Sequence, residues 1–536
     1  MHRAGVDVHG YILDGDETGQ WQQAMRLAHA GDMAGASDLM QELAKRKPGF
    51  APAKVQASYF MLAADRYRKA RGLALDAAGM RPRSPEFALE LIRLLRRFEE
   101  QEAILRIHDQ VDWQRLASAR LLVALAAELG PIGLYAQARA LLDAAREKAV
   151  DDVQALTIRG TLDMIAGNAG SARSSLQHAL DASASDLPHV RWMLSMQPDD
   201  ARIDEEIRRT QAALERVVPQ TEDDAYLSFA LHNLLHAAGD HEQAWRALER
   251  GCRTKRRLVG YDPSGQHRLF AVLQAHDWRT DARDGPLPRE GDPGLVFIVG
   301  MHRSGTSVLE RVLAGHDGVC DGGESYVFPA CMREATDHLS RGVVDLLMAE
   351  RAPGAALGPV AERFTAHARW RANGRKWFVE KLPSNFLHIG AILAAMPQAR
   401  ILHMVRDPMD TCFSNLRTHF SDAAPYSYDQ AELADYYGLY RGLMAHWHGM
   451  FPGRILDVDY QAFVSDPERE TRRVTGFCGI PFQARALDIA AGSGHVATAS
   501  VSTARRGILR DRGGAWQPYA GHLRTLSDHL QRVDAF

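Results

Sequence analysis

A turn residue followed five positions later by a small or apolar residue recurs along the first half of the chain. The pattern repeats every 34 residues, with one poorer match in the middle, and returns once more after two periods plus four residues. The matching pairs are Gly31…Ala36, Asp65…Ala70, Glu99…Ile104, Gly133…Ala138, Gly167…Ala172 and Gly239…Ala244. One pair of short helices cannot bury its own apolar face, so a period of this length predicts several helical hairpins stacked into a solenoid.

This period resembles that of tetratricopeptide repeats, which mostly bind protein segments. We therefore predict an N-terminal all-α tetratricopeptide-type solenoid in residues 1–280, with a protein partner as its expected ligand. Composition alone, rich in Ala, Leu, Arg and Glu, leaves an irregular helical bundle as the alternative. Glycine, proline and charge then replace the helical pattern, which predicts a linker at 281–294.

The chain changes character after this linker. An apolar run, LVFIV at 295–299, leads into the loop GMHRSGTS at 300–307, and a helical pattern follows. Further strands are expected at 377–379, 400–405 and 454–458, with helical patterns between them. This alternation predicts a three-layer α/β domain with a parallel sheet over 295–536, whose ligands bind at the carboxyl ends of the strands.

The loop has the spacing of a nucleotide phosphate loop, but Thr306 stands where such a loop carries lysine. Glycines 300 and 305 let main-chain N–H groups approach a tetrahedral anion, and Arg303 adds a fixed charge. A nucleoside triphosphatase also needs a magnesium-binding acid, for which Asp457 and Asp459 are the near candidates. The sequence favours an anionic donor that needs no metal, over both a triphosphatase and a plain glycine turn.

Four motifs in this order, GMHRSGTS, GGES at 322–325, EKLP at 380–383 and RDPMDTCFS at 406–414, resemble the sulfotransferase superfamily. Together with the repeats ahead of them, they are most similar to the bacterial tetratricopeptide-repeat sulfotransferases and the related tyrosylprotein sulfotransferases. The resemblance extends from 295 to about 520 and implies a P-loop-like sulfotransferase domain. It also implies an enzyme that moves a sulfuryl group from 3′-phosphoadenosine 5′-phosphosulfate to an acceptor hydroxyl.

The resemblance assigns roles around the transferred group. The 5′-phosphosulfate is expected on the loop residues Arg303, Ser304, Gly305, Thr306 and Ser307. Arg303 and Lys381 are expected to stabilise charge on the leaving oxygen, since transfer should be an in-line displacement. Glu324 is expected to be the general base that removes the acceptor proton, with Asp321 as a solvated alternative.

A second anchor is expected for the 3′-phosphate. Arg406 offers a planar fork matched to phosphate oxygens, and Ser414 a hydroxyl. Asp407 and Pro408 should cap and begin a helix there. Tyr460 matches a family tyrosine near the nucleotide, although a packed core tyrosine is the alternative.

The C-terminal segment resembles the family's closing loop, and the resemblance implies donor contacts from Ser500, Arg505, Gly514 and Trp516. Four positions depart from the family's usual residues, which puts donor affinity in doubt; these are His302, Ser502, Gly507 and Ala515. Proline is usual at 302, and its loss should cost less than ~1 kcal/mol of preorganisation. The His302 ring is expected to be neutral and to face solvent.

Global features leave the partners open. A net charge of −3 gives no indication of nucleic acid, and no apolar run is long enough to span a membrane. Five scattered cysteines indicate neither a disulfide framework nor a zinc cluster, so a cytoplasmic protein without a metal site is expected. His446 and His448 point to different sides of a helix and do not make a metal pair.

The acceptor remains a peptide, a sugar or a small molecule. The alternative function is a helical-repeat peptide-binding scaffold with a catalytically degenerate nucleotide-binding domain.

Overall fold

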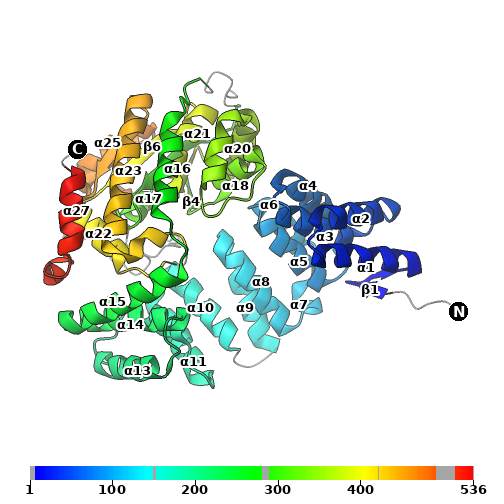
Figure 1. Cartoon of the computed structure of the whole chain (residues 1–536), viewed down its shortest axis with the longest axis horizontal. Helices are drawn as coiled ribbons and strands as arrows, with labels where there is room; N and C mark the ends of the chain where they lie inside the picture. The colour runs from blue at the N-terminus through cyan, green and yellow to red at the C-terminus, as the bar shows by residue number, and fades with distance from the viewer. Residues whose placement is uncertain (1–5, 149–151, 281–288, 421, 490–512, 535–536) are drawn as a thin grey trace. The chain divides into compact units, whose positions relative to one another are not determined.

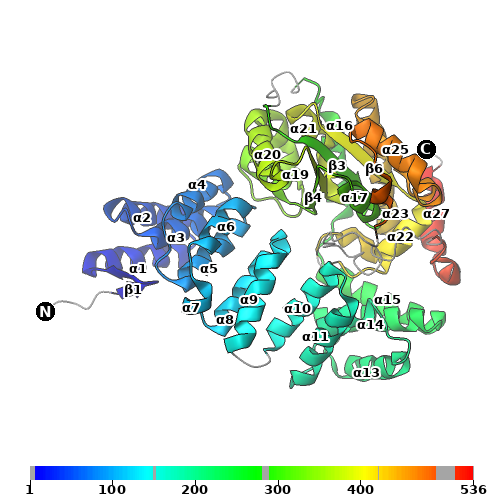
Figure 2. The same ribbon diagram turned by 180° about the vertical axis from the view of Figure 1, so that it is seen from behind.

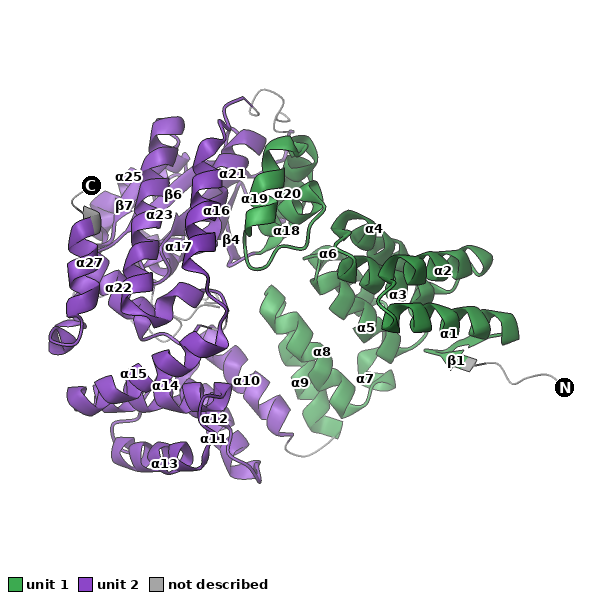
Figure 3. Ribbon diagram, viewed as in Figure 1, with its two compact units in different colours: residues 1–150, 326–370 green, residues 151–325, 371–536 purple. Residues whose placement is uncertain are grey.

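The computed structural model describes residues 6–148, 152–280, 289–420, 422–489 and 513–534. The chain divides into two compact units, each built from two stretches of sequence (Figure 3). One unit comprises Met1–Val150 and Tyr326–Trp370, and the other Asp151–Ser325 and Arg371–Phe536. The predicted linker lies partly outside the described residues, and the predicted domain limits there stay a prediction.

Helical hairpins fill the first half of the chain, so the helical N-terminal region is confirmed (Figure 1). The first unit opens with a short antiparallel strand pair and helices up to residue 148. These are β1 (Val6–Val8), β2 (Tyr11–Leu13), α1 (Gly15–His29), α2 (Met33–Arg46), α3 (Ala51–Ala63), α4 (Tyr67–Ala78), α5 (Pro85–Arg96), α6 (Gln101–Asp109), α7 (Trp113–Leu116), α8 (Ala119–Leu129) and α9 (Tyr135–Lys148).

The second unit contains the remaining helices of the first half. These are α10 (Val153–Ala166), α11 (Ala169–Ala182), α12 (Pro188–Ser195), α13 (Ile203–Arg216), α14 (Glu222–Ala237), α15 (His241–Leu258) and α16 (Pro263–Ala275). Each unit therefore packs its own set of hairpins.

The repeated turn has one conformation at all six predicted positions. Its first residue has a positive φ whether it is glycine or not, including Asp65 at 55° and Glu99 at 57°. The next N–H donates to the carbonyl five residues back, as Glu100 does to Leu95, which closes a Schellman-type helix end. The small or apolar residue five positions after the turn is buried, including Ile104 at 0% exposure. The weak match at Glu99 is thus a full member of the series.

The second unit also contains the predicted parallel sheet. Its strands are β3 (Gly294–Gly300), β4 (Val319–Gly323), β5 (Trp377–Lys381), β6 (Arg400–Val405) and β7 (Ile455–Asp459), in the order β4-β5-β3-β6-β7. All of their pairings are parallel. Four strands were expected from the sequence, and β4 was missed because only Val319 and Cys320 precede its polar end.

Helices cover both faces of this sheet (Figures 1 and 2). On one face a core joins the strands to α17 (Thr306–Ala314), α24 (Tyr460–Ser465) and α25 (Pro467–Cys478). The other face packs against α16, α21 (Ile389–Ala395) and α23 (Gln430–Met450), with Trp447 fully buried there. The three-layer prediction is confirmed. Among the described residues, no helix combines the length and apolar composition that a membrane span requires.

Three helices inserted between β4 and β5 belong to the first unit. They are α18 (Val327–Thr336), α19 (Leu346–Arg351) and most of α20 (Leu357–Ala372). Arg71 contacts Glu100 at 2.7 Å and Glu334 at 2.8 Å, and Arg363 contacts the same two carboxylates at 2.9 Å each. This network of two cations and two anions ties the inserted helices to the first repeats. The chain leaves for this insertion directly after Ser325.

Candidate active site

The loop between β3 and α17 has the close-packed geometry of an anion cradle. Gly300 and Gly305 have φ values of 153° and 108°, where side chains are strained. A Cβ on Gly300 would lie 2.8 Å from the Met404 carbonyl oxygen, and one on Gly305 would lie 2.4 Å from the Tyr460 ring. Both glycines are therefore required by the packing of β6 and α24 against the loop.

Hydroxyl groups lie at the start of α17, where its N–H groups favour an anion. Ser304, Thr306 and Ser307 are buried. The Ser304 Oγ is fully enclosed, and no described residue of the chain hydrogen-bonds to it. A buried donor of this kind fits a phosphate or sulfate oxygen, because an unsatisfied hydroxyl costs about 1–3 kcal/mol.

The structure brings Arg303, Arg406 and Ser414 together at the ends of β3 and β6. Arg303 Nε donates to Ser414 Oγ at 3.1 Å, and Arg406 Nη1 donates to the Arg303 carbonyl at 3.4 Å. The Arg406 guanidinium also lies over the Tyr460 ring, 4.7 Å from its centroid. Tyr460 is a core residue at 6% exposure, so the core fixes its ring, and the ring in turn supports Arg406 and the loop.

The turn before α22 (Pro408–Leu416) is built as predicted. Asp407 accepts from the Asp410 N–H at 2.8 Å and caps the helix, which Pro408 begins. Asp410 in turn accepts from the Gly514 N–H at 2.7 Å and lies 3.7 Å from Arg406 Nη2. Gly514 is thus attached to the helix that follows Arg406.

The other predicted donor contacts of the C-terminal segment lie only partly within the described residues. Trp516 precedes the short helix η7 (Gln517–Tyr519) and is half-buried. Ser500 and Arg505 lie outside the described residues, as do Ser502 and Gly507. The hydroxyl of Tyr519, the last residue of η7, hydrogen-bonds His236 Nδ1 on α14 at 2.8 Å.

Lys381 is the centre of a second cluster, at the ends of β4 and β5. Its side chain is fully buried, and Nζ contacts Glu324 Oε1 at 2.5 Å and Glu310 Oε2 at 3.7 Å. Burial opposes the charge on Lys381, but the two carboxyl groups outweigh it and raise its pKa. The Glu324 side chain is 33% exposed, so it remains accessible to a ligand.

Glu310 on α17 was missed by sequence reasoning. Burial, together with nearby Asp321, raises the pKa of Glu310 well above its usual value. The contact of Glu310 with Lys381, at 3.7 Å, is longer than the 2.5 Å pair of Lys381 with Glu324. Asp321 accepts from the Gly323 N–H, so it is engaged rather than solvated as expected. The sequence feature that could have indicated Glu310 is a carboxyl residue within the largely apolar helical stretch VLERVL.

His302 does not face solvent, contrary to expectation. Its ring lies between Tyr426, 3.1 Å from Nδ1, and Ser384, 3.3 Å from Nε2, and it packs against Phe420. Burial lowers the pKa of His302 to about 4, so the ring is neutral at pH 7 as expected. Tyr426 and Ser384 come from distant segments, which is why the loop sequence did not indicate this position.

The two candidate magnesium ligands have other roles. Asp457 lies opposite His403 in the pairing of β7 with β6. Its carboxylate contacts the rings of His403 and His448. Asp459 accepts from the Ala462 N–H at 2.7 Å and caps α24. Neither carboxylate is placed as a triphosphatase would need.

The loop, the sheet and the charged groups lie within a stretch that matches a known protein family. The model of the sulfotransferase family matches residues 293–484. These residues form a sulfotransferase-family domain. The sulfotransferase domain includes the loop, Glu324, Lys381, Arg406, Ser414 and Tyr460.

Individual relatives are distant. An uncharacterized protein of Aquifex aeolicus is 27% identical over 345 residues, covering 61% of this chain and 44% of that protein. The chain thus spans less than half the length of that relative. A "Putative protein-tyrosine sulfotransferase" of Caenorhabditis briggsae is 22% identical over 197 residues, which are 36% of this chain and 68% of that protein. A solved sulfotransferase domain from the curacin biosynthetic pathway is 16% identical, with a TM-score of 0.33, and covers 45% of this chain and 96% of its own.

Proposed function

We propose that the chain is a sulfotransferase that moves a sulfuryl group from 3′-phosphoadenosine 5′-phosphosulfate to an acceptor hydroxyl. The main support is the meeting, at one edge of the sheet, of a lysine-free anion cradle, two guanidinium groups and a lysine–glutamate pair. A triphosphate is a poorer ligand for this edge, because Thr306 replaces the lysine that contacts the outer phosphates.

In this proposal Ser304, Gly305, Thr306 and Ser307 hold the 5′-phosphosulfate through main-chain N–H and hydroxyl groups. Arg406 and Ser414 hold the 3′-phosphate, and Tyr460 supports Arg406 from the core. Gly514 and Trp516 are proposed to lie near the nucleotide, since Gly514 is bonded to the helix that begins beside Arg406. Ser500 and Arg505 complete the proposed donor contacts.

The bound donor supplies the sulfuryl group and a phosphate oxygen that leaves with negative charge. Arg303 and Lys381 are proposed to stabilise that charge, which grows in the transition state, so their effect falls on turnover. Two fixed cations at this oxygen serve the purpose that a divalent ion serves in triphosphatases.

Glu324 is proposed to accept the proton of the acceptor hydroxyl. Lys381 Nζ contacts one of its oxygens and holds the side chain at the sheet edge, while a third of its surface stays exposed to the acceptor. Protonation of Glu324 weakens its pair with Lys381, which leaves the ammonium group for the departing oxygen. The same proton transfer therefore prepares both ends of an in-line displacement.

The acceptor is proposed to be a hydroxyl on a peptide, a sugar or a small molecule. The helical repeats are proposed to bind a protein partner, as repeats of this period mostly do. All five cysteines are free and buried, which supports the proposed cytoplasmic location.

The test combines donor binding with turnover on the full chain. Calorimetry with adenosine 3′,5′-bisphosphate should show binding, and incubation with the donor and a panel of tyrosine peptides, sugars and phenols should release that bisphosphate. Arg303→Ala should lower both signals. A wild type that binds no bisphosphate would exclude the enzyme. A wild type that binds it and also a peptide, yet turns over no acceptor, would favour the scaffold.

A further inference from the structure

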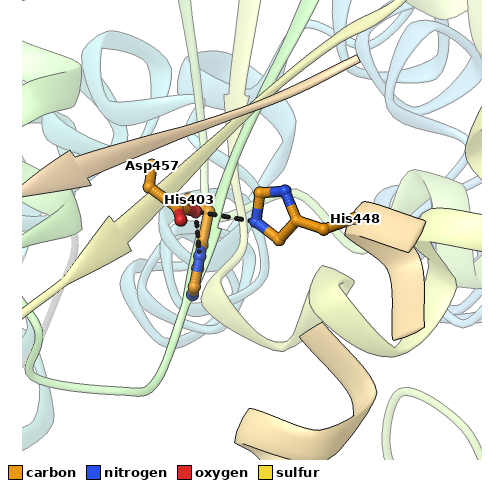
Figure 4. Close-up of side chains that lie close together, drawn as sticks. All are labelled: His403, His448 and Asp457. Atoms are coloured by element: carbon orange, nitrogen blue, oxygen red, sulfur yellow. Dashed lines mark hydrogen bonds and ion pairs between the residues drawn. The ribbon is translucent and has the colours of Figure 1, made fainter. Parts of the chain in front are cut away.

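Three metal-ligating side chains converge outside the proposed active site (Figure 4). His403 lies in the middle of β6, Asp457 in the middle of β7, and His448 near the end of α23. The His403 Nδ1 is 2.7 Å from Asp457 Oδ1, and the His448 Nε2 is 2.9 Å from the same oxygen. One ligand atom from each residue lies within 4.8 Å of the others.

The fold places these residues firmly. His403 and Asp457 are direct partners in the parallel pairing of β6 with β7, so their side chains lie on the same face of the sheet. That face packs against α23, the helix that carries His448. The site opens to solvent, because the Asp457 side chain is 55% exposed and that of His448 is 36% exposed, against 7% for His403.

The buried side of the cluster has the second layer of contacts that metal-binding histidines usually have. The remaining ring nitrogen of His403, Nε2, hydrogen-bonds the hydroxyl of buried Tyr440. That contact fixes the ring so that Nδ1 points at Asp457. The Tyr440 hydroxyl also hydrogen-bonds the main chain of Met301, in the anion loop. The Asp457 carbonyl accepts from Arg473 Nη2 at 2.8 Å, which fixes the backbone of β7.

We propose that His403 Nδ1, His448 Nε2 and the Asp457 carboxylate bind a divalent transition-metal ion of the zinc class, with solvent in the remaining position. Two imidazoles and one carboxylate suit zinc and its neighbours, whereas magnesium prefers oxygen ligands alone. Ligand atoms about 2.1 Å from a tetrahedral ion lie about 3.4 Å apart, so the contacts of 2.7 and 2.9 Å must open by about 0.7 and 0.5 Å. Rotation of the two exposed side chains supplies that movement.

Binding requires the proton on each ligating ring nitrogen to leave it, either to the other nitrogen of the ring or to solvent. Both hydrogen bonds to Asp457 Oδ1 use ring N–H groups, and a metal needs the same nitrogens without protons. The hydrogen-bonded cluster and the metal complex are therefore alternative states of one set of side chains. This inference is independent of the proposed transferase activity.

The test is a titration of the full chain, dialysed first against a chelator, with Zn²⁺ in competition with a chromogenic chelator. Wild type should bind one ion per chain at this site, and His448→Gln and Asp457→Asn should bind it at least about 10-fold more weakly. The matched control is His446→Gln, two positions earlier on α23, whose ring packs against Trp447. It should bind zinc as wild type does, and Mg²⁺ should not compete.

Cobalt gives a second readout that does not depend on affinity. Co²⁺ bound to wild type and to His446→Gln should show the intense visible absorption of a four-coordinate site, and His448→Gln should lose it. Thermal unfolding in chelator shows whether a variant is misfolded. If Asp457→Asn is misfolded, the result rests on His448→Gln, because the His448 side chain is partly exposed and its substitution should leave the fold intact. Equal zinc binding by wild type and His448→Gln, no zinc binding by wild type, or equal competition by Mg²⁺ would each overturn the proposal.

Discussion

The two sides of the sheet's carboxyl edge hold charge in opposite ways. On the β3–β6 side, Arg303 and Arg406 contact a hydroxyl, a carbonyl and an aromatic ring, and Arg406 lies 3.7 Å from the Asp410 carboxylate. On the β4–β5 side, Lys381 is fully buried and paired with Glu324 at 2.5 Å. The proposed anion site is on the first side, next to two guanidinium groups, whereas the cation of the second side has a close carboxylate partner.

This difference indicates which residues should determine donor binding and which should determine turnover. An anion site made from main-chain N–H groups and a guanidinium is encoded within a few consecutive residues. The carboxylate proposed to exchange protons depends on partners from several elements, here β4, β5 and α17. Substitutions on the first side should therefore change binding, and substitutions on the second should change turnover or proton occupancy.

The largest expected effect is on the second side. Glu324→Gln preserves the size of the side chain but removes the base, so kcat should fall by about 10²–10⁴-fold. Binding of adenosine 3′,5′-bisphosphate should change little, since that ligand is held on the other side. Initial rates and calorimetry on the same preparations measure the two quantities.

The control for this prediction is Asp321→Asn, three residues earlier. Asp321 contacts Glu310 and the Gly323 N–H, so its substitution should reduce turnover far less than that of Glu324. Equal losses in the two variants would show that the whole carboxylate cluster acts structurally, and the contrast between the two sides would then fail.

The next effect belongs to the first side. Arg406→Ala removes a charged donor and its stacking on Tyr460, which should weaken bisphosphate binding by about 10–100-fold. The matched variant Ser414→Ala removes only a neutral hydroxyl and should cost less. A fall in kcat without a change in affinity would contradict a phosphate-holding role for Arg406.

Sequence reasoning succeeded for features that depend on near neighbours in the chain and failed for features that depend on distant ones. GMHRSGTS and RDPMDTCFS placed the glycines, Arg303, Arg406 and the Asp407 cap, because each depends on neighbours a few residues away. The strand β4, the carboxyl of Glu310 and the buried ring of His302 were missed. Each is stabilised by residues far along the chain, such as Phe378 of β5 for β4 and Tyr426 for His302.

A smaller effect should appear in stability against pH. Glu380 on β5 is buried, with one oxygen hydrogen-bonded to Asn385 at 2.7 Å, and burial raises its pKa to about 8. Between about pH 4.5 and 8 the folded state keeps a proton that the unfolded state releases, so stability falls as pH rises. Glu380→Gln should remove this part of the fall, and its stability relative to wild type should increase by about 1 kcal/mol from pH 6 to pH 7. Urea unfolding at the two pH values measures it, and an unchanged difference would mean that Glu380 is ionised in the folded protein.

The smallest effect concerns His302, whose ring lies near both sides. Its pKa of about 4 keeps it neutral over the working range, so it acts through shape and not through charge. His302→Ala removes the contacts with Tyr426, Ser384 and Phe420, whereas His302→Pro removes them and also restricts the loop backbone. The difference between the two variants isolates preorganisation, and the proline variant should bind the bisphosphate more tightly than the alanine variant by less than ~1 kcal/mol. A proline variant that binds more weakly would mean that the loop needs a backbone angle or an N–H at position 302 that proline cannot provide. The β3–β6 side would then depend on this one residue as specifically as the β4–β5 side depends on Glu324.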